Sequence, residues 1–285
     1  MSLIYLQSGI RIKNIGNNHQ YFSSGATIIP LLNEEQIGKL LRIFYTNFNP
    51  DNLPLLYDTI ATEPAHHIKK INQEILSVIG EPLSNALENF EIVCSIFIIK
   101  KPGNDSYLNF HIDPTMTYRH LNNMALWIPL CDIDEHTGML CLDLATRNMV
   151  DYYTFTMPCP FAGYEETIRK HSVCFPMKSG EALLFDNRIL HCTERNLSTK
   201  LRVAVVSKII DKSAPLVTVY YFKDNPPGKQ AALYEHKRNI FLSGEFRLSV
   251  PPDDSIFVKY LPHLPLSFSE DAYLKHREEV MKKSP

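Results

Sequence analysis

The stretch SGEALLFDNRILHCTERNLSTKLRVAVVSKII, residues 179–210, alternates short β-branched and aromatic runs with turn residues. Such runs predict β-strands, here EALLFD, ILHCT and LRVAVVSKII. His191 lies in the second predicted strand, and Arg202 opens the third. A hairpin between these two strands places both side chains on one interior wall. The stretch therefore predicts a β-rich fold with polar groups turned inward.

The same pattern extends back to residue 91. Eight short strands punctuated by Gly and Pro are typical of a sandwich or jelly-roll barrel, in which two sheets of four enclose a ligand-sized interior. We expect a mainly β fold with flanking helices, and a functional site in that interior. The five further predicted strands are EIVCSIFIIKKPG (91–103), YLNFHID (107–113), MALWIPLCDI (124–133), GMLCLDL (138–144) and SVCFPM (172–177).

The region before this core, residues 1–90, is expected to be mainly helical. Asn33 and Gln36 have the spacing of a capping box, and apolar residues then recur at helical spacing. A second helix is predicted after Pro64, ending at Gly80, and Pro82 is expected to start a third, short helix.

Beyond the core, residues 211–285 are expected to elaborate the same domain. The run 216–222 predicts an added edge strand, and 271–283 a charged helix. Within the core, residues 145–170 lack a clear period, and loops of that length are usually functional or disordered. We expect one domain over 1–285, with its barrel at 91–210.

Composition excludes several classes of protein. Lysine and arginine number 29 against 31 acidic residues, and no basic stripe is present, so a nucleic-acid partner is not expected. The longest apolar run, near 92–99, is far shorter than a membrane span, and the first residues do not resemble a signal peptide. Six cysteines at wide, irregular intervals, without a CxxC pair, predict buried reduced thiols and a cytoplasmic protein.

The motif FHIDP supplies two candidate metal ligands. His111 and Asp113 are two residues apart on a predicted strand, so both side chains point to one face. Two histidines and one carboxylate on one side of an ion leave positions open for a chelating cosubstrate and dioxygen, and His191 supplies the second histidine. An HxD pair alone is common by chance, but Arg202 adds a bidentate partner for a dicarboxylate cosubstrate.

Four segments together resemble the phytanoyl-CoA dioxygenase-like branch of the iron(II) and 2-oxoglutarate oxygenases, over about residues 91–210. The resemblance implies a double-stranded β-helix, the cupin-like jelly roll, with Fe(II), 2-oxoglutarate and O2 as cofactor and cosubstrates. The segments are FHID (110–113), NNMALWIPLCDIDEHTGML (122–140), SGEALLFDNRILHCTERN (179–196) and LRVAV (201–205).

The resemblance also implies roles for particular residues. His111, Asp113 and His191 match the family's iron ligands, and Arg202 matches the arginine that binds 2-oxoglutarate. Where the family has a PGSH-like segment, this chain reads LATRN, so the substrate cannot be transferred from relatives. Related halogenases replace the carboxylate ligand with a small residue. Asp113 therefore favours hydroxylation, with desaturation or ring closure as other outcomes.

Further candidates are assigned by position. Trp127 matches a family tryptophan near the active site, although core packing is the more ordinary role for it. Additional cosubstrate contacts are hypothesised for Asn109, Thr117 and Lys100. Substrate contacts are hypothesised for four side chains of the long insertion: Arg147, Tyr152, Tyr153 and Tyr164.

The sequence predicts an oxygenase that acts on a small organic molecule, for example in natural-product or amino-acid metabolism, and releases succinate and CO2. Two alternatives stay open. One is a metal-binding sensor or scaffold on the same barrel, and the other is an oxygen-independent cupin-type metalloenzyme. Oligomeric state is not accessible from these patterns.

Overall fold

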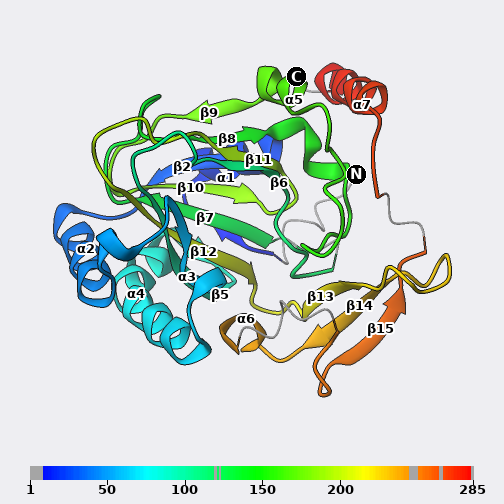
Figure 1. The fold of residues 1–285 in the computed structure, drawn as a ribbon, viewed down its shortest axis with the longest axis horizontal. Coiled ribbons are helices and arrows are strands. Elements are labelled where there is room, and N and C mark those ends of the chain that lie inside the picture. Colours follow the sequence, from blue (N-terminus) through cyan, green and yellow to red (C-terminus); the bar gives the residue numbers. More distant parts are fainter. Residues whose placement is uncertain (1–8, 119–120, 122, 244–249, 263–265, 284–285) are drawn as a thin grey trace.

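Two antiparallel sheets form the centre of the computed structural model, which describes residues 9–118, 121, 123–243, 250–262 and 266–283 (Figure 1). The larger sheet has the strand order β2-β10-β7-β12-β5-β3, and the smaller one β6-β11-β8-β9. The larger sheet contains β2 (Ala26–Pro30), β3 (Leu56–Asp58), β5 (Phe90–Lys100), β7 (Asn123–Pro129), β10 (Glu181–Asp186) and β12 (Arg202–Asp211). The smaller contains β6 (Leu108–His111), β8 (Leu140–Asp143), β9 (Val173–Phe175) and β11 (Leu190–Thr193).

The eight strands predicted between residues 91 and 210 are all present, so the mainly β prediction is confirmed. They contribute four strands to each sheet. The larger sheet gains β2 at one edge and β3 at the other, and both come from the region that was expected to be mainly helical. β2 pairs with β10 from Glu181↔Pro30 to Phe185↔Ala26. A strand of five residues flanked by helices is too short for its period to stand out in the sequence.

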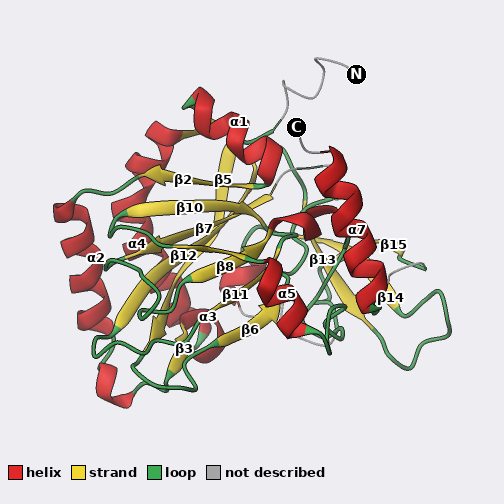
Figure 2. Cartoon of the chain, turned by 90° about the horizontal axis from the view of Figure 1, so that it is seen from above, coloured by secondary structure: helices red, strands yellow, loops and turns green. Residues whose placement is uncertain are grey.

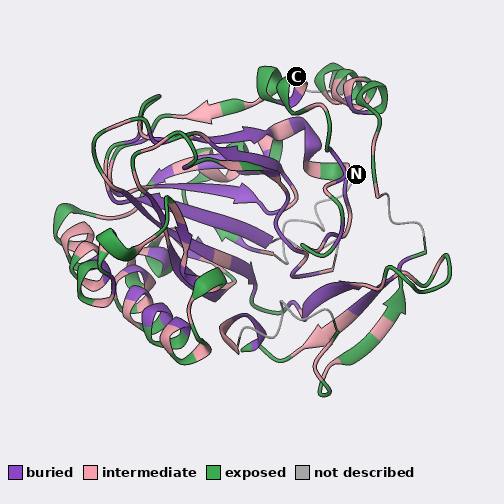
Figure 3. Cartoon of the chain, viewed as in Figure 1, coloured by how far each residue is buried: buried purple, intermediate pink, exposed green. Residues whose placement is uncertain are grey.

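Apolar side chains from the two sheets meet in one layer of core. Trp127 of β7, Leu183 of β10 and Val206 of β12 pack in the same buried cluster as Leu140 and Leu142 of β8. The alternating side chains of the larger sheet turn the other way and form a second cluster against the helices. This two-faced burial explains why its strands are buried along almost their whole length (Figure 3).

Three helices cover the outer face of the larger sheet (Figure 2). Each contributes an apolar stripe to that cluster, including Tyr21, Phe44 and Ile75. None of the helices in the described part of the chain is both long and apolar enough to cross a membrane. The three helices are α1 (Ile15–Ser24), α2 (Glu34–Asn47) and α4 (Ala65–Ala86).

The helix boundaries confirm one sequence prediction and correct another. The capping box at the start of α2 is present, with Asn33 Oδ1 accepting from the Gln36 backbone and Gln36 Oε1 accepting from the Asn33 backbone. The predicted break at Gly80 and Pro82 is wrong, because α4 continues to Ala86. Its buried stripe runs on through Leu83, and burial of that stripe outweighs the single hydrogen bond that a proline removes.

A third sheet lies beside the other two and was not predicted. It consists of β13 (Leu216–Tyr221), β14 (Ala231–His236) and β15 (Ile256–Tyr260). The run at 216–222 was expected to extend a sheet edge, whereas β13 pairs with β14 instead. The short helix α6 (Ile240–Ser243) follows β14. In the long insertion, η3 (Leu144–Asn148) and α5 (Glu165–His171) replace the expected irregular loop at its two ends.

The remaining short elements connect these parts. Of them, α3 follows β3 directly and lies beside β5. They are β1 (Arg11–Ile12), η2 (Pro50–Asn52), α3 (Thr59–Thr62) and β4 (Leu87–Glu88).

The expectation that all cysteines are free thiols is wrong for two of them. Cys141 of β8 and Cys174 of β9 face each other across the antiparallel pair and form a disulfide. Cys192 of β11 is the neighbour of Cys141 on its other side. Sequence spacing did not reveal this row, because the three residues become adjacent only through strand pairing. The other cysteines, Cys94, Cys131, Cys159 and Cys192, are free thiols.

The last helix, α7 (Glu270–Lys283), confirms the helix predicted at 271–283 and is tied to the smaller sheet. Asp143, at the end of β8, is completely buried. Its carboxylate accepts a hydrogen bond of 2.6 Å from the Tyr273 hydroxyl and pairs with Arg277, both on α7. A buried carboxylate is stable only when it is paired in this way, so these two contacts attach the otherwise largely exposed α7 to the smaller sheet.

Candidate functional site

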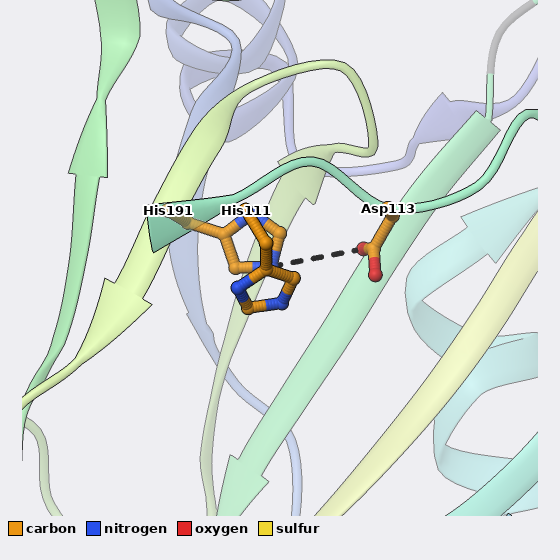
Figure 4. A group of neighbouring side chains, drawn as sticks. All are labelled: His111, Asp113 and His191. Atoms are coloured by element: carbon orange, nitrogen blue, oxygen red, sulfur yellow. Dashed lines mark ion pairs between the residues drawn. The ribbon is translucent and has the colours of Figure 1, made fainter. Parts of the chain in front are cut away.

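His111, Asp113 and His191 converge between the two sheets (Figure 4). Their ligand atoms all lie within 4.8 Å of one another. His191 Nε2 is 3.9 Å from Asp113 Oδ2, and the two imidazole centroids are 4.2 Å apart. The geometry follows from register, because His111 of β6 pairs directly with His191 of β11. Two imidazoles and one carboxylate at these distances fit the ligand set of a non-haem iron site.

Backbone contacts fix which imidazole nitrogens face the centre. His111 Nδ1 lies 2.8 Å from the Asn109 carbonyl, and His191 Nδ1 lies 2.8 Å from the Ile189 carbonyl. A carbonyl only accepts, so each Nδ1 carries the proton and each Nε2 keeps its lone pair. Such contacts orient metal-binding histidines and set their tautomer.

Burial holds the three side chains in the protonation states that metal binding needs. It lowers the pKa of His111, and burial together with the neighbouring His111 lowers the pKa of His191 to about 3. For Asp113, burial alone raises the pKa, but the neighbouring positive charge of Lys208 outweighs it and lowers the pKa. The imidazoles are therefore neutral and the carboxylate charged at neutral pH.

Arg202 opens β12 and is almost completely buried, with 1% of its surface exposed. Its Nη1 donates to the Gly138 carbonyl at 2.7 Å, and its guanidinium lies 5.4 Å from the Trp127 ring centroid. Nε and Nη2 have no hydrogen-bond partner within the described part of the chain. Burial lowers the pKa of Arg202 to about 10, so it remains charged at neutral pH. A buried cation with two unpaired donors fits an anionic ligand.

Thr193 is a site residue that the sequence did not single out. It lies two residues past His191 on β11, so its side chain points to the same interior face. Its hydroxyl is buried and has no partner among the described atoms. The spacing of two residues between His191 and Thr193 on one strand is the sequence signal that could have predicted Thr193 as a site residue. Thr193 and Arg202 together offer one hydroxyl and two guanidinium donors to a ligand.

Gly138, whose carbonyl accepts from Arg202, lies close against the backbone of Glu194 and Arg195. Its φ of +83° is in the left-handed region, and a Cβ there would lie 2.7 Å from the Glu194 carbonyl. Glycine is the residue that fits this position without strain. It brings the β7–β8 turn against the chain that follows β11.

The other candidate cosubstrate residues lie in different surroundings. Lys100 is buried opposite Arg202, where it donates to the carbonyls of Thr193 and Glu194, and burial lowers its pKa to about 6. Thr117 accepts a 2.9 Å hydrogen bond from Asn123 Nδ2. Asn109 is exposed. Of these three, only Lys100 adjoins the Arg202 end of the site, and its donors are taken by backbone. Trp127 is 3% exposed and stacks near Arg202, so it contributes to both core and site.

A cavity of about 550 Å³ borders His111 and Asp113. The four insertion residues that were expected to bind substrate are absent from its lining. Tyr153 and Tyr164 pack with Phe161 in the cluster outside the smaller sheet. Tyr152 packs at the edge of that cluster, with Lys259 over its ring. The insertion contributes Thr154, Phe155 and Thr156 to the cavity instead.

Arg147, the fourth of those residues, pairs with buried Asp186 at 2.9 Å. Arg188 binds the same carboxylate through Nε at 2.9 Å and Nη2 at 2.7 Å. The role of Arg147 could not be predicted from its poorly periodic segment, because no sequence spacing links residue 147 to residue 186.

We expect Asp186→Asn to destabilise the protein near neutral pH by about 3–5 kcal/mol, since it leaves two arginines facing a neutral group. Burial alone raises the pKa of Asp186, but Arg188 and Arg147 outweigh it and lower the pKa below its usual 3.8. The stabilisation is therefore present above pH 3.8 and is lost as the pH falls through the folded-state pKa. The free energies of unfolding of the wild-type protein and of Asp186→Asn, measured in urea from pH 7 to pH 3, should become more similar at acid pH. Exposed Asp224→Asn is the control, and an unchanged difference at pH 3 would contradict the assignment.

Comparison with known proteins places this site in a family. The model of the phytanoyl-CoA dioxygenase family matches residues 33–204, which include all three candidate ligands and Arg202. No curated protein matches the chain.

Solved structures show the same fold. The non-haem α-ketoglutarate-dependent carbocyclase SnoK from nogalamycin biosynthesis is similar with a TM-score of 0.50 and 16% identity, over 71% of this chain and 86% of SnoK. AviO1 from Streptomyces viridochromogenes Tue57 has a TM-score of 0.49 and 14% identity, over 72% and 97% of the two chains. EvdO2 from Micromonospora carbonacea var. aurantiaca, complexed with 2-oxoglutarate, has a TM-score of 0.48 and 16% identity, over 72% and 94%. At these identities the likeness to SnoK concerns the fold alone, and the weaker two add nothing to it. The family match covers more than half of the chain, and the chain therefore belongs to the phytanoyl-CoA dioxygenase family of non-haem iron and 2-oxoglutarate-dependent oxygenases.

Proposed function

We propose that the chain oxidises a small organic molecule with Fe(II), 2-oxoglutarate and O2. His111, Asp113 and His191 hold the iron through two Nε2 atoms and one carboxylate oxygen. Arg202 and Thr193 bind the distal carboxylate of 2-oxoglutarate. The observation that carries this proposal is the pair of unpaired guanidinium donors on a side chain that is 1% exposed. A group of that kind is costly to bury unless an anion completes it.

Iron and 2-oxoglutarate, when bound, supply the oxidising chemistry, in which the cosubstrate becomes succinate and CO2 and one oxygen atom of O2 passes to the substrate. The protein orients the metal ligands and excludes water from the site. The Asn109 and Ile189 carbonyls hold both imidazoles with Nε2 inward. The apolar layer around Trp127 and Leu142 excludes water from the space between the sheets. Hydroxylation is the proposed outcome, since Asp113 fills the position that a halide would need.

We further propose that the two facing sheets form the double-stranded β-helix expected of this family, and that residues 1–285 form one oxygenase domain. Two contacts support a single domain. Val219 of β13 and Phe241 of α6 line the cavity beside the ligands. Tyr273 and Arg277 of α7 bind buried Asp143 of the smaller sheet.

Anaerobic titration tests the proposal. The protein loaded with Fe(II) is expected to bind 2-oxoglutarate with the visible absorption of an iron chelate, and then to form succinate when O2 is admitted. Iron binding without 2-oxoglutarate binding would overturn the assignment and favour a metal sensor. Turnover of a substrate without O2 would favour an oxygen-independent metalloenzyme, in which Arg202 has no evident partner.

A further inference from the structure

The cavity beside the ligands has mainly aliphatic walls. It is formed by parts of the chain that are far apart in sequence: α3, β5, the segment after β6, β12, the insertion and the third sheet. Its volume of about 550 Å³ is in the range of pockets that enclose small organic ligands. The apolar lining residues are Ile60, Ala61, Cys94, Ile96, Ile98, Leu108, Pro114, Met116, Phe155, Val206, Val219 and Phe241.

One cation, Lys208, is found among the described residues that line this cavity. Its ammonium pairs with Asp113, so it lies at the end of the cavity nearest the iron ligands. Its side chain is 16% exposed. A charge this deeply enclosed in an apolar wall needs a partner of opposite sign.

Strand β12 carries two cations on one face. Arg202, Ala204, Val206 and Lys208 alternate toward the space between the sheets, and the two small apolar residues separate the two charges. At about 3.3 Å per residue, the Cα atoms of Arg202 and Lys208 are about 20 Å apart. The pairing of β12 with β5 shifts register directly after Lys208, and such irregularities commonly re-aim a side chain beside a site.

Iron changes the surroundings of Lys208. In the protein alone, Lys208 and Asp113 neutralise each other. Asp113 would hold a ferrous ion through the same carboxylate, which would leave Lys208 without its full counter-charge. The other acid of the lining, Asp58, accepts a 2.8 Å hydrogen bond from the Ile60 backbone at the start of α3. Asp58 keeps its charge but caps α3, so Lys208 is the lining cation whose partner carboxylate the metal would share.

We propose that the substrate is a largely apolar molecule with one carboxylate, and that Lys208 binds that carboxylate. The inference rests on the proposed function, because it assumes that iron and 2-oxoglutarate occupy the site. The apolar walls select the body of the molecule, and Lys208 selects its charged group. Lys208 is therefore a specificity-determining residue, and its charge discriminates against amines and neutral analogues.

Three probes with the same chain test this assignment: decanoate, 1-decanol and decylamine. Each is titrated calorimetrically into anaerobic protein that already holds Fe(II) and 2-oxoglutarate. Decanoate is expected to bind at least tenfold more tightly than the other two. Lys208→Met keeps the length and apolar stem of the side chain and is expected to abolish this preference, whereas Lys208→Arg retains it. In Lys208→Met the affinity for 2-oxoglutarate, measured separately, stays unchanged, and the affinity for iron does not fall.

Two control variants test whether decanoate binds in this cavity. Exposed Lys212→Met removes a nearby charge outside the cavity and leaves all affinities unchanged. Ala61→Trp narrows the cavity at an exposed part of its wall, and it is expected to weaken decanoate binding at least tenfold without affecting iron or 2-oxoglutarate.

Several outcomes overturn the proposal. Decylamine or decanol binding as tightly as decanoate would contradict the assigned charge. If Lys208→Met lowers iron affinity but keeps the preference for decanoate, Lys208 only positions Asp113. Failure of the wild-type protein to bind 2-oxoglutarate would instead refute the proposed function, and it is detected before any probe is added.

Discussion

Replacement of His191 by alanine is expected to lower the affinity for Fe(II) by more than about 100-fold, since loss of even a supporting contact to a metal ligand costs 10- to 100-fold. The variant loses one of three protein ligands, and we expect Fe(II) to dissociate more readily from the remaining His111 and Asp113. Succinate formation should fall at least as far at limiting iron. Iron binding is measured by anaerobic competition with a chromogenic chelator.

His66→Ala is the matched control, because His66 is exposed on α4, far in sequence from the site, and alanine suits a helix. It should leave iron affinity and turnover unchanged. Retention of wild-type iron affinity by His191→Ala, in a protein with an intact unfolding transition, would refute the assigned ligand set.

Arg202→Met is expected to raise the Kd for 2-oxoglutarate by roughly 10²- to 10³-fold. Removing one partner of a buried ion pair costs about 3–5 kcal/mol, and about 1.4 kcal/mol corresponds to a factor of ten. Iron affinity should not change, since the hydrogen bond that Arg202 donates goes to the Gly138 carbonyl and not to any of the three ligands. Anaerobic titration of the Fe(II) protein with 2-oxoglutarate, followed by visible absorption, measures the effect.

The same substitution has a second, opposite consequence. Without cosubstrate, Arg202 is a buried cation with two unpaired donors, so methionine should make the protein no less stable to urea. Exposed Arg42→Met, on α2, is the control for loss of an arginine. A variant that binds 2-oxoglutarate normally would show that the unpaired donors serve another ligand.

The strands of the central sheets were predictable because their side chains alternate or are buried on both faces over a short run. Turn residues then separated all eight strands. The third sheet and β2 were not predictable, because pairing between distant segments selects them rather than local period. The continuation of α4 through Pro82 was also not predictable from local sequence. The proline opposes a helix, but burial of Leu83 against the larger sheet stabilises it.

For the site, spacing along a strand proved informative where the partners share a strand face. The convergence of His111, Asp113 and His191 follows from a two-residue spacing and from the register between β6 and β11, whereas the hairpin predicted between the strands of His191 and Arg202 is wrong, because these strands lie in different sheets. Thr193 and Lys208 carried the same signal, at two residues from His191 and six from Arg202. The role of Arg147 had no such signal, since only the tertiary fold brings its partner Asp186 beside it.

The attachment of α7 to Asp143 also bears on how the protein is synthesised. Asp143 is made 134 residues before Arg277 and 130 before Tyr273. At about 5–20 residues per second, translation separates them by roughly 7–27 s. During that interval β8, whose Leu142 pairs with His191, cannot bury its terminal carboxylate with its final partners. Burial of Asp143 with these partners, and with it the final packing of β8 beside His191, is therefore expected only after α7 has left the ribosome.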